Sequence, residues 1–340
     1  MRKYLMILVS FAALLTSCTH KELCYTHREH AHRYHINIIA DYRYDWEECY
    51  GGIDWKKNWP ENYLDYDALR PTKPGGLRVV NYNIVDGYNI HNLSADGGVV
   101  NLYEGVNNIL FYNNDTEYIL FSREVDGNFA TTRATTRTKT RSSYIGSEYA
   151  LEGEETMTPP DMLYANFIEG HTPDKVEEPT PIEITLQPLV FTYKVRYEFE
   201  SGLEFAAMSR GALSGMARSV TMDTGETSKE SATIIYDCEM TDYGARALVT
   251  TFGIPDFPNV NYPTRTEDRK HALNLEVLMR NGKMITFDFD VTDQVLAQPH
   301  GGVIVVKGIK IDESVGTSGS GAFDVEVNDW GEYEDIELPM

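Results

Sequence analysis

Five histidines gather near the start of the chain, and their types and spacing raise the question of a metal site. They are His20, His27, His30, His32 and His35, and Cys24 lies among them. Imidazole and thiolate groups are ligands that zinc and copper accept. The pair His30 and His32 is too close for one face of a helix, and the set matches no metal-binding motif. The pattern favours a polar tether with chance histidines, so we expect no metal and no cofactor.

Cys18 is the residue with the clearest chemical role. Arg2 and Lys3 precede an uncharged apolar run, which ends at Leu15-Thr16-Ser17-Cys18. This layout is typical of a signal peptide and is too short for a membrane span. The last four residues resemble the bacterial lipobox, in which a peptidase cuts before a cysteine whose sulfur carries diacylglycerol. We therefore predict a lipoprotein signal peptide at residues 1–17, cleavage between Ser17 and Cys18, and acyl chains such as palmitate on Cys18, where two or more chains give stable anchoring. An ordinary signal peptide with a chance cysteine is the alternative.

The remaining cysteines allow at most one internal bridge. Once Cys18 carries lipid, Cys24, Cys49 and Cys238 remain, and an odd number leaves one thiol unpaired. A bridge between Cys24 and Cys49 would join the N-terminal segment to the first domain. Buried free thiols are the alternative.

Charge and composition narrow the function classes. The formal net charge is −22, which argues against nucleic acid because phosphate binding needs a basic patch. No later stretch reaches the ~20 apolar residues of a spanning helix, so the predicted lipid is the membrane attachment. The sequence lacks the nucleophile elbow, the zinc-protease helix motif, the phosphate-binding loop and the dinucleotide fingerprint. We expect no enzyme, although paired carboxylates of a glycosidase leave no sequence motif to search for.

Short alternating segments between turn residues predict an all-β fold. Residues 32–40 alternate with Ile36 and Ile38 on one face, and residues 190–199 alternate in the same way. Asn281-Gly282 between two such segments is a strong hairpin signal. Residues 203–213 are the best candidate for a short helix or helical turn. Strands at this spacing indicate β-sandwiches.

Composition shifts predict the domain organisation. A lipidated tether is expected at 18–31, an N-terminal β-sandwich domain at 32–181 and a C-terminal β-sandwich domain at 182–340. Residues near 126–160 are rich in Thr and Arg and are expected to form a disordered, exposed loop. Its arginines Arg133, Arg137 and Arg141 are candidate protease-sensitive positions.

A group of aromatic residues is the remaining candidate binding surface. Trp46, Trp55 and Trp59 lie in one irregular segment with several tyrosines. Aromatic faces stack on sugars and on partner proteins. Packing over the open end of the first sandwich is the alternative role.

Several segments together resemble a Bacteroidales lipoprotein family that is related in layout to fimbrillins and fimbrial anchor subunits. They are the lipobox, Lys21-Glu22-Leu23-Cys24-Tyr25, residues 112–117 and residues 323–330. The resemblance implies two tandem transthyretin-like β-sandwich domains. It also implies assembly by strand exchange, in which a strand of one subunit completes the sheet of the next. In stalk subunits of that family an arginine-specific protease removes the first strand. Here the arginine cluster lies far beyond Cys18, where cleavage would remove most strands of the first domain, so an uncleaved anchor fits better.

These patterns lead to one functional expectation and one alternative. The first is a lipid-anchored structural protein on the cell surface at the outer membrane, acting in adhesion as a fimbrial anchor, accessory or tip subunit. Its expected partners are the membrane through the lipid, and fimbrial subunits or other surface proteins through β-strand contacts. The alternative is an outer-membrane glycan-binding lipoprotein that uses Trp46, Trp55 and Trp59.

Overall fold

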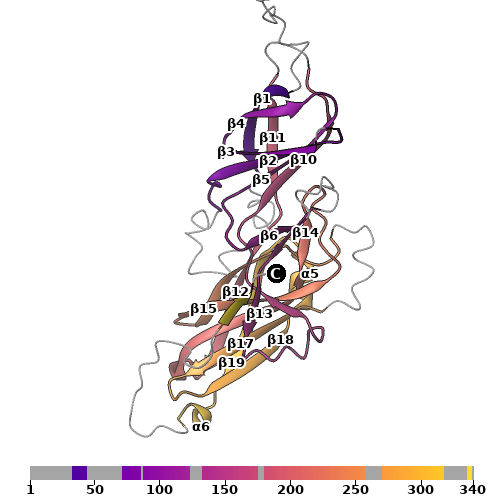
Figure 1. Cartoon of the computed structure of the whole chain (residues 1–340). Helices are drawn as coiled ribbons and strands as arrows, with labels where there is room; N and C mark the ends of the chain where they lie inside the picture. Colours follow the sequence, from indigo (N-terminus) through magenta and orange to yellow (C-terminus); the bar gives the residue numbers. More distant parts are fainter. Residues whose placement is uncertain are drawn as a thin grey trace, which may run out of the picture.

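The computed structural model describes residues 33–43, 71–85, 87–122, 132–174, 180–257, 270–317 and 335–338. The prediction of an all-β protein is confirmed, because strands build nearly all of the regular structure in these ranges. Short helical segments interrupt them: η4 (Leu203–Phe205), α5 (Thr292–Leu296) and α6 (Glu313–Gly316). Figure 1 shows an elongated molecule with a barrel at one end and a larger curved sheet at the other. In the described part of the chain, no helix is long and apolar enough to cross a membrane.

Seven strands close into the barrel, in the order β1-β11-β10-β5-β2-β3-β4. β1 pairs with β4 on one side and, in parallel, with β11 on the other, which closes the ring. The strands are β1 (Arg33–Tyr42), β2 (Gly76–Asn83), β3 (Gly87–Ser94), β4 (Gly97–Tyr103), β5 (Asn107–Asn113), β10 (Tyr164–His171) and β11 (Ile182–Pro188).

Alternating side chains fill the interior of the barrel. Ile36 and Ile38 of β1 are buried while Ile39 is exposed, as the predicted alternation requires. Ile182, Ile184 and Leu186 of β11 complete the pattern on the neighbouring strand. Each buried aliphatic side chain contributes roughly 1.5–3 kcal/mol of transfer free energy, so this cluster is the main stabilising feature of the barrel.

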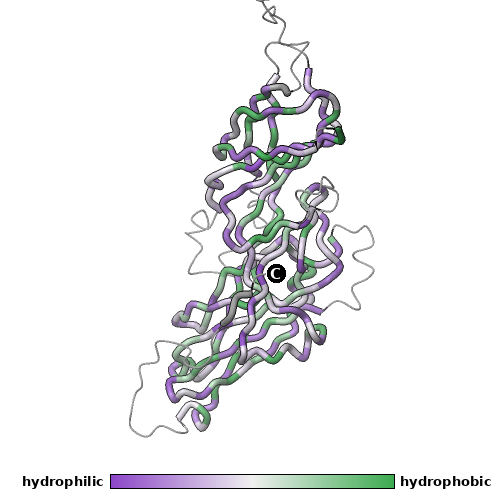
Figure 2. The backbone as a smooth tube through the Cα atoms, in the orientation of Figure 1, coloured by the Kyte–Doolittle hydropathy of each residue, from purple (hydrophilic) through white to green (hydrophobic). Residues whose placement is uncertain are grey.

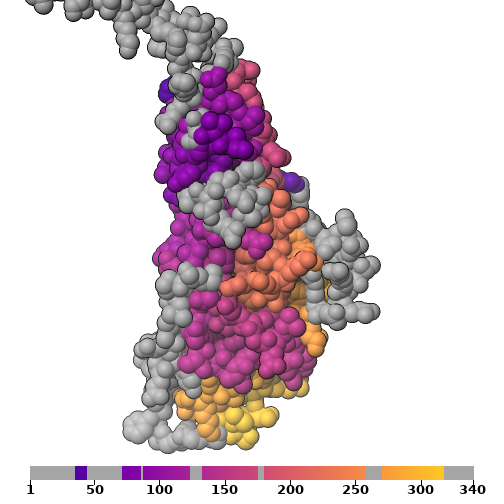
Figure 3. All heavy atoms as spheres, turned by 45° about the vertical axis from the view of Figure 1, so that its right-hand side comes forward, coloured from indigo at the N-terminus to yellow at the C-terminus, as the bar shows by residue number. Residues whose placement is uncertain are grey.

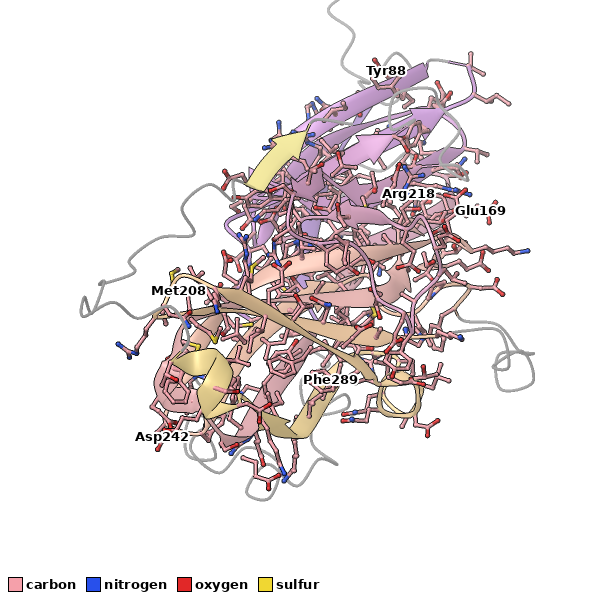
Figure 4. The ribbon with its side chains drawn as sticks, turned by 90° about the horizontal axis from the view of Figure 1, so that it is seen from below. Tyr88, Glu169, Met208, Arg218, Asp242 and Phe289 are labelled. Atoms are coloured by element: carbon pink, nitrogen blue, oxygen red, sulfur yellow. The ribbon has the colours of Figure 1, made fainter. Side chains whose placement is uncertain are left out.

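The second end of the molecule is a ten-stranded sheet, here called the large sheet. Its main path runs β18-β17-β13-β15-β16-β12-β19, and a branch of β9, β8 and β20 leaves β15. Figure 4 marks Phe289 of β18, whose ring lies 6.4 Å from the rings of Tyr197 and Phe287. The strands are β8 (Thr138–Arg141), β9 (Glu155–Met157), β12 (Phe191–Ser201), β13 (Ala206–Ala217), β15 (Ser231–Thr241), β16 (Gly244–Thr251), β17 (Ala272–Met279), β18 (Met284–Asp290), β19 (Gly302–Lys310) and β20 (Asp335–Leu338).

The hairpin predicted at Asn281-Gly282 is confirmed. It joins β17 to β18, and the backbone N–H of Met279 donates to the carbonyl of Lys283 at 2.8 Å. Gly282 has φ of 80°, a left-handed conformation that glycine adopts at little cost.

Residues 203–213 differ from the helix that their composition suggests. Only Leu203–Phe205 turn as a 3-10 helix, and Ala206 onward forms the long strand β13. Small residues on β13 allow close approach: a Cβ at Gly211 would lie 2.5 Å from the Tyr236 ring. Tertiary packing against β15 and β17 therefore overrides the local helical preference.

A three-stranded sheet connects the barrel to the large sheet. It consists of β6 (Ile119–Ser122), β7 (Arg133–Thr136) and β14 (Ser219–Thr221), in the order β14-β7-β6. A buried cluster, here called the bridging cluster, takes residues from both units, including Tyr112 of β5, Leu189 of the connection and Phe252 beyond β16. Figure 3 shows the two units as one continuous column of atoms, and Figure 2 shows apolar backbone positions running through both.

Strand pairing departs from the domain boundary expected at residue 181. β11, which begins at Ile182, belongs to the barrel, whereas β8 and β9 join the large sheet although they precede the boundary. Composition marks loops and linkers, but it carries no information about which distant strands pair.

Candidate strand-docking edge

The predicted site residues divide into two groups. Ser17, Cys18, Cys24, Cys49, Trp46, Trp55 and Trp59 lie outside the described residues, so their proposed roles stay predictions. Arg133, Arg137 and Arg141 lie within them.

The disordered Thr/Arg loop expected near residues 126–160 is wrong for the described part of that segment. Arg133–Thr136 form β7, Thr138–Arg141 form β8 and Glu155–Met157 form β9. Threonine is β-branched and fits a pleated strand, which a composition-based reading of low complexity overlooks. Arg133 is exposed and Arg137 is half-buried, but Arg141 is only 3% exposed. Arg141 is thus shielded from a protease in the folded chain.

Arg141 fastens β8 onto the large sheet. Its Nη1 donates to the carbonyl of Gly211 on β13 at 3.1 Å, and its Nη2 donates to the carbonyl of Tyr236 on β15 at 3.2 Å. Gly211 and Tyr236 face each other across the β13–β15 ladder. The planar guanidinium holds two donors in a fixed fork, so one side chain ties β8 to two strands at once.

The carboxylate of Glu276 lies between two buried guanidiniums next to this contact. Glu276 Oε2 lies 3.4 Å from Arg210 Nε and 3.7 Å from Arg141 Nη1, and all three side chains are at most 2% exposed. The Ser143 hydroxyl donates to the same oxygen at 3.0 Å. Such a buried group is costly to break because the remaining charge cannot be hydrated.

Buried hydroxyl groups surround the charges. The hydroxyls of Tyr197 and Tyr236 share a hydrogen bond of 2.9 Å, and burial raises the pKa of both phenols well above their ordinary value. Thr233 and Ser231 donate to Glu154, which fixes the chain that enters β9. The phenols stay neutral at physiological pH, so the arrangement holds β8 and β9 in place and supplies no acid or base to a ligand.

The outer edge of β8 carries the C-terminal strand. β20 pairs antiparallel with β8, with Asp335 opposite Arg141 and Leu338 opposite Thr138. On its other side β8 pairs with β9 at Thr138 and Met157, and Thr156 Oγ1 and the N–H of Thr158 donate to the carbonyls of Lys139 and Arg137. Arg141 and these bonds hold β8 without β20, so the β20-facing edge of β8 is the candidate docking edge for an extended strand.

A different edge of the large sheet is closed by side chains. The Gln298 amide accepts from the N–H of Val303 at 2.8 Å and donates to its carbonyl at 3.0 Å. The Gln294 amide makes the same two bonds with Val305, at 2.9 and 3.1 Å. Two glutamines of α5 and the turn after it thus occupy alternate backbone positions of β19, where another strand would otherwise pair.

The motifs considered in the sequence did not include these glutamines, although their spacing carries a signal. They stand four residues apart, which places both on one side of a helical turn. Gly301-Gly302 follows them, and a Cβ at Gly302 would lie 2.0 Å from Gln298 Oε1. A short helix with Gln at i and i+4 before a glycine pair and an apolar strand is a pattern that indicates a capped edge.

A cavity of about 220 Å³ lies where the barrel connects to the large sheet. The rings of Phe191 and His300 stack at 4.6 Å, and Phe257 meets His300 edge-on at 4.7 Å. Burial lowers the pKa of His300 below its ordinary value, so the ring is neutral at pH 7. The volume is below the ~300–1,000 Å³ of typical ligand pockets, so the cavity suits a single ring or side chain.

Cys238 of β15 is the free cysteine in the described ranges. Burial raises the pKa of its thiol well above the ordinary value, which keeps it protonated and unreactive. Within the described residues no group of three or more His, Cys, Asp or Glu side chains could hold a metal ion.

The chain is similar to one protein family and to several solved structures. The family model described as Domain of unknown function (DUF5119) matches residues 62–237. A solved structure of a candidate adhesin from Bacteroides ovatus is 20% identical, with 87% of this chain and 97% of that chain covered and a TM-score of 0.57. That likeness shows a shared fold. The fimbrial anchor protein Mfa2 of Porphyromonas gingivalis is 12% identical over 80% of this chain and 90% of that one, with a TM-score of 0.43. No curated protein sequence matches the chain.

Proposed function

The chain belongs to the family described as Domain of unknown function (DUF5119), and from this premise we propose that it is a lipid-anchored structural protein of the cell surface. In this proposal it acts as a fimbrial anchor, accessory or tip subunit and holds its partners by adding β-strands at a sheet edge. The Bacteroides ovatus protein that shares the fold is described as a candidate adhesin. The proposal also assigns a transthyretin-like β-sandwich fold to each of the two units, the barrel and the large sheet.

The pairing of β20 with β8 carries the proposal. β20 is four residues long. A strand of this length contributes few backbone hydrogen bonds, whereas Arg141 holds β8 independently of it. A partner strand can therefore replace β20 on an edge that stays in place, which is recognition by strand addition.

The closed edge of β19 supports the choice of the β8 edge as the docking site. Gln294 and Gln298 occupy the backbone groups of Val305 and Val303. Strand addition there would first have to remove four side-chain hydrogen bonds. At the β8 edge an incoming strand exchanges the backbone pairing of β20 for its own, so the bonds that are lost are replaced by equivalent ones.

A peptide-exchange experiment tests the docking edge. A chain that lacks residues 335–340 is expected to bind a synthetic peptide spanning 329–340, because the peptide restores β20. A peptide with Ile336→Pro is the matched control, since proline removes a backbone donor and is expected to abolish binding. Equal binding of the two peptides to the shortened chain, measured by fluorescence anisotropy, contradicts strand addition.

Anchoring and the fimbrial role need separate measurements. Mass spectrometry of the mature chain is expected to show acyl groups on Cys18, and an unmodified Cys18 would remove the anchor. Deletion of the gene is expected to change the length or retention of surface fimbriae. Unchanged fimbriae would count against the fimbrial role and leave the lipid anchor untouched.

The aromatic cavity supports a second candidate function, which is glycan binding. Phe191, His300 and Phe257 offer ring faces and edges in a space that suits one sugar ring. If the cavity binds glycan, Phe257→Ala should reduce the signal on a glycan array. If instead the signal falls only when Trp46, Trp55 and Trp59 are replaced by alanine, binding belongs to the predicted aromatic platform. Silence of the unmodified chain across the array excludes this function.

A further inference from the structure

Two buried asparagines shape the end of the barrel that faces away from the large sheet. Asn83 is 6% exposed, and its amide donates to the carbonyls of Glu104 and Val106 at 3.2 and 3.1 Å. Asn107 is fully buried, and its amide donates to the carbonyls of Tyr103 and Gly105 at 2.8 Å each. These bonds tie the β2–β3 turn to the β4–β5 turn and satisfy backbone groups that would otherwise face solvent.

Three of the residues that these turns expose are apolar. Ile84 is 99% exposed, Val85 is 85% exposed and Val106 is 55% exposed. Val85 is fixed by its own N–H, which donates to Asn83 Oδ1 at 2.9 Å. We call Ile84, Val85 and Val106 the barrel tip. Turn residues are usually polar, so exposed β-branched side chains above buried asparagines favour contact with an apolar medium.

The strand register places the start of β1 at this same end of the barrel. Asn83 pairs with Asn107, and Arg33 at the start of β1 pairs with Tyr103 at the end of β4. The predicted lipid attachment at Cys18 is separated from β1 by residues 19–32. Fully extended, those residues span at most about 50 Å. β11 runs parallel to β1 and leads directly to β12 of the large sheet, so the start of β1 lies at the end of the barrel opposite the large sheet.

We propose that the barrel tip inserts into the surface of the lipid bilayer to which the N-terminus is anchored, and thereby sets the molecule upright on the membrane. The proposal rests on the proposed function only in requiring that residue 18 be held at a membrane. A lipid surface is the occupant because the tether limits the tip to the space next to the bilayer, and because the tip is small, apolar and preorganised.

The charges around the barrel tip show how the contact works. Glu104, Glu169 and Asp174 are exposed at the same end of the barrel, so anionic lipid does not attract this surface. Insertion therefore depends on the transfer of Ile84, Val85 and Val106 from water. A few aliphatic side chains bind a bilayer weakly, so they orient a chain that is already tethered and do not recruit a free one.

A site-specific fluorescence experiment tests the proposal. The mature chain, with native cysteines replaced, carries one environment-sensitive label at Ile84→Cys or, as matched control, at Ile145→Cys. Ile145 is 94% exposed, like Ile84, but it follows β8, which is a strand of the large sheet and not of the barrel. An N-terminal hexahistidine tag tethers the chain to vesicles of phosphatidylethanolamine and phosphatidylglycerol that contain a nickel-chelating lipid, so the test does not depend on acylation of Cys18.

The two labels are expected to respond differently. On tethering, emission at position 84 should shift to the blue and lose access to aqueous iodide, while position 145 stays unchanged. Adding Val85→Asp and Val106→Asp to the chain labelled at position 84 should return its label to solvent. Equal responses at 84 and 145, or a label at 84 that stays open to iodide, overturn the proposal. Absence of acyl groups on native Cys18 would instead overturn the anchor of the proposed function.

Discussion

At the residue scale, the buried charges beneath β8 give the sharpest stability prediction. Glu276→Gln removes the buried carboxylate that lies between the guanidiniums of Arg141 and Arg210, so we expect a loss of roughly 3–5 kcal/mol in the free energy of unfolding. Arg210→Met should cost less, since one pair remains. Urea denaturation measures both. Glu239→Gln is the control, because its pair with Arg246 is largely exposed and worth at most ~1 kcal/mol. A loss for Glu276→Gln no larger than that of the control contradicts this account.

The buried His300 predicts a pH dependence at the same scale. Burial lowers the pKa of His300, so the unfolded chain takes up a proton more readily than the folded one. Stability is therefore unaffected above the unfolded pKa of about 6.5 and falls as the pH drops from there towards the lower folded pKa. His300→Phe keeps the stack on Phe191 and removes the titration, so its stability should fall less between pH 7 and 5. The pKa of His171 is also lowered by burial, so part of the dependence should remain. Identical pH profiles of the two proteins in thermal melts would refute the assignment.

At the scale of single elements, the glutamines that close β19 predict a change in association. Gln294→Ala with Gln298→Ala exposes the backbone groups of Val303 and Val305, and an open edge pairs with other chains. We expect concentration-dependent self-association in sedimentation experiments, with the overall fold retained. Gln187→Ala is the control, because its side chain contacts Thr185 and Arg43 on the barrel and closes no edge. A double variant that stays monomeric at all concentrations would show that the edge is protected in another way.

Single elements also show which features of the fold the sequence predicts and which it does not. Alternation on β1 and the Asn281-Gly282 turn are local, and such local patterns identified these elements and the all-β class correctly. Strand pairing is not local, because β11 pairs with β1 although more than a hundred residues separate them in the sequence. Composition therefore could not predict the barrel or its boundary. Arg141 shows the limit for the site, because an arginine among threonines is read as exposed unless its partner Glu276 is known.

At the scale of the whole molecule, the bridging cluster predicts that the two units unfold together. Tyr112 faces this cluster and Phe111, the next residue on β5, faces the barrel interior; both are fully buried. Either change to alanine should cost about 3–5 kcal/mol. Tyr112→Ala should also split the single calorimetric transition into two, because it removes the ring that packs on Phe121 of β6 at 4.7 Å. Phe111→Ala should lower the transition temperature and leave one transition.

The contrast between Tyr112→Ala and Phe111→Ala tests the proposed role. A subunit that bears load needs a rigid connection between the barrel tip, which is proposed to contact the membrane, and the β8 edge, which is proposed to bind a partner strand. The barrel tip and the β8 edge belong to different units, and the bridging cluster is the buried apolar contact that both units share in the described part of the chain. If Tyr112→Ala keeps a single transition with an unchanged ratio of calorimetric to van't Hoff enthalpy, the units are coupled by other contacts. If instead the unmodified chain already melts in two steps, the bridging cluster does not transmit force, and a rigid upright subunit is no longer supported.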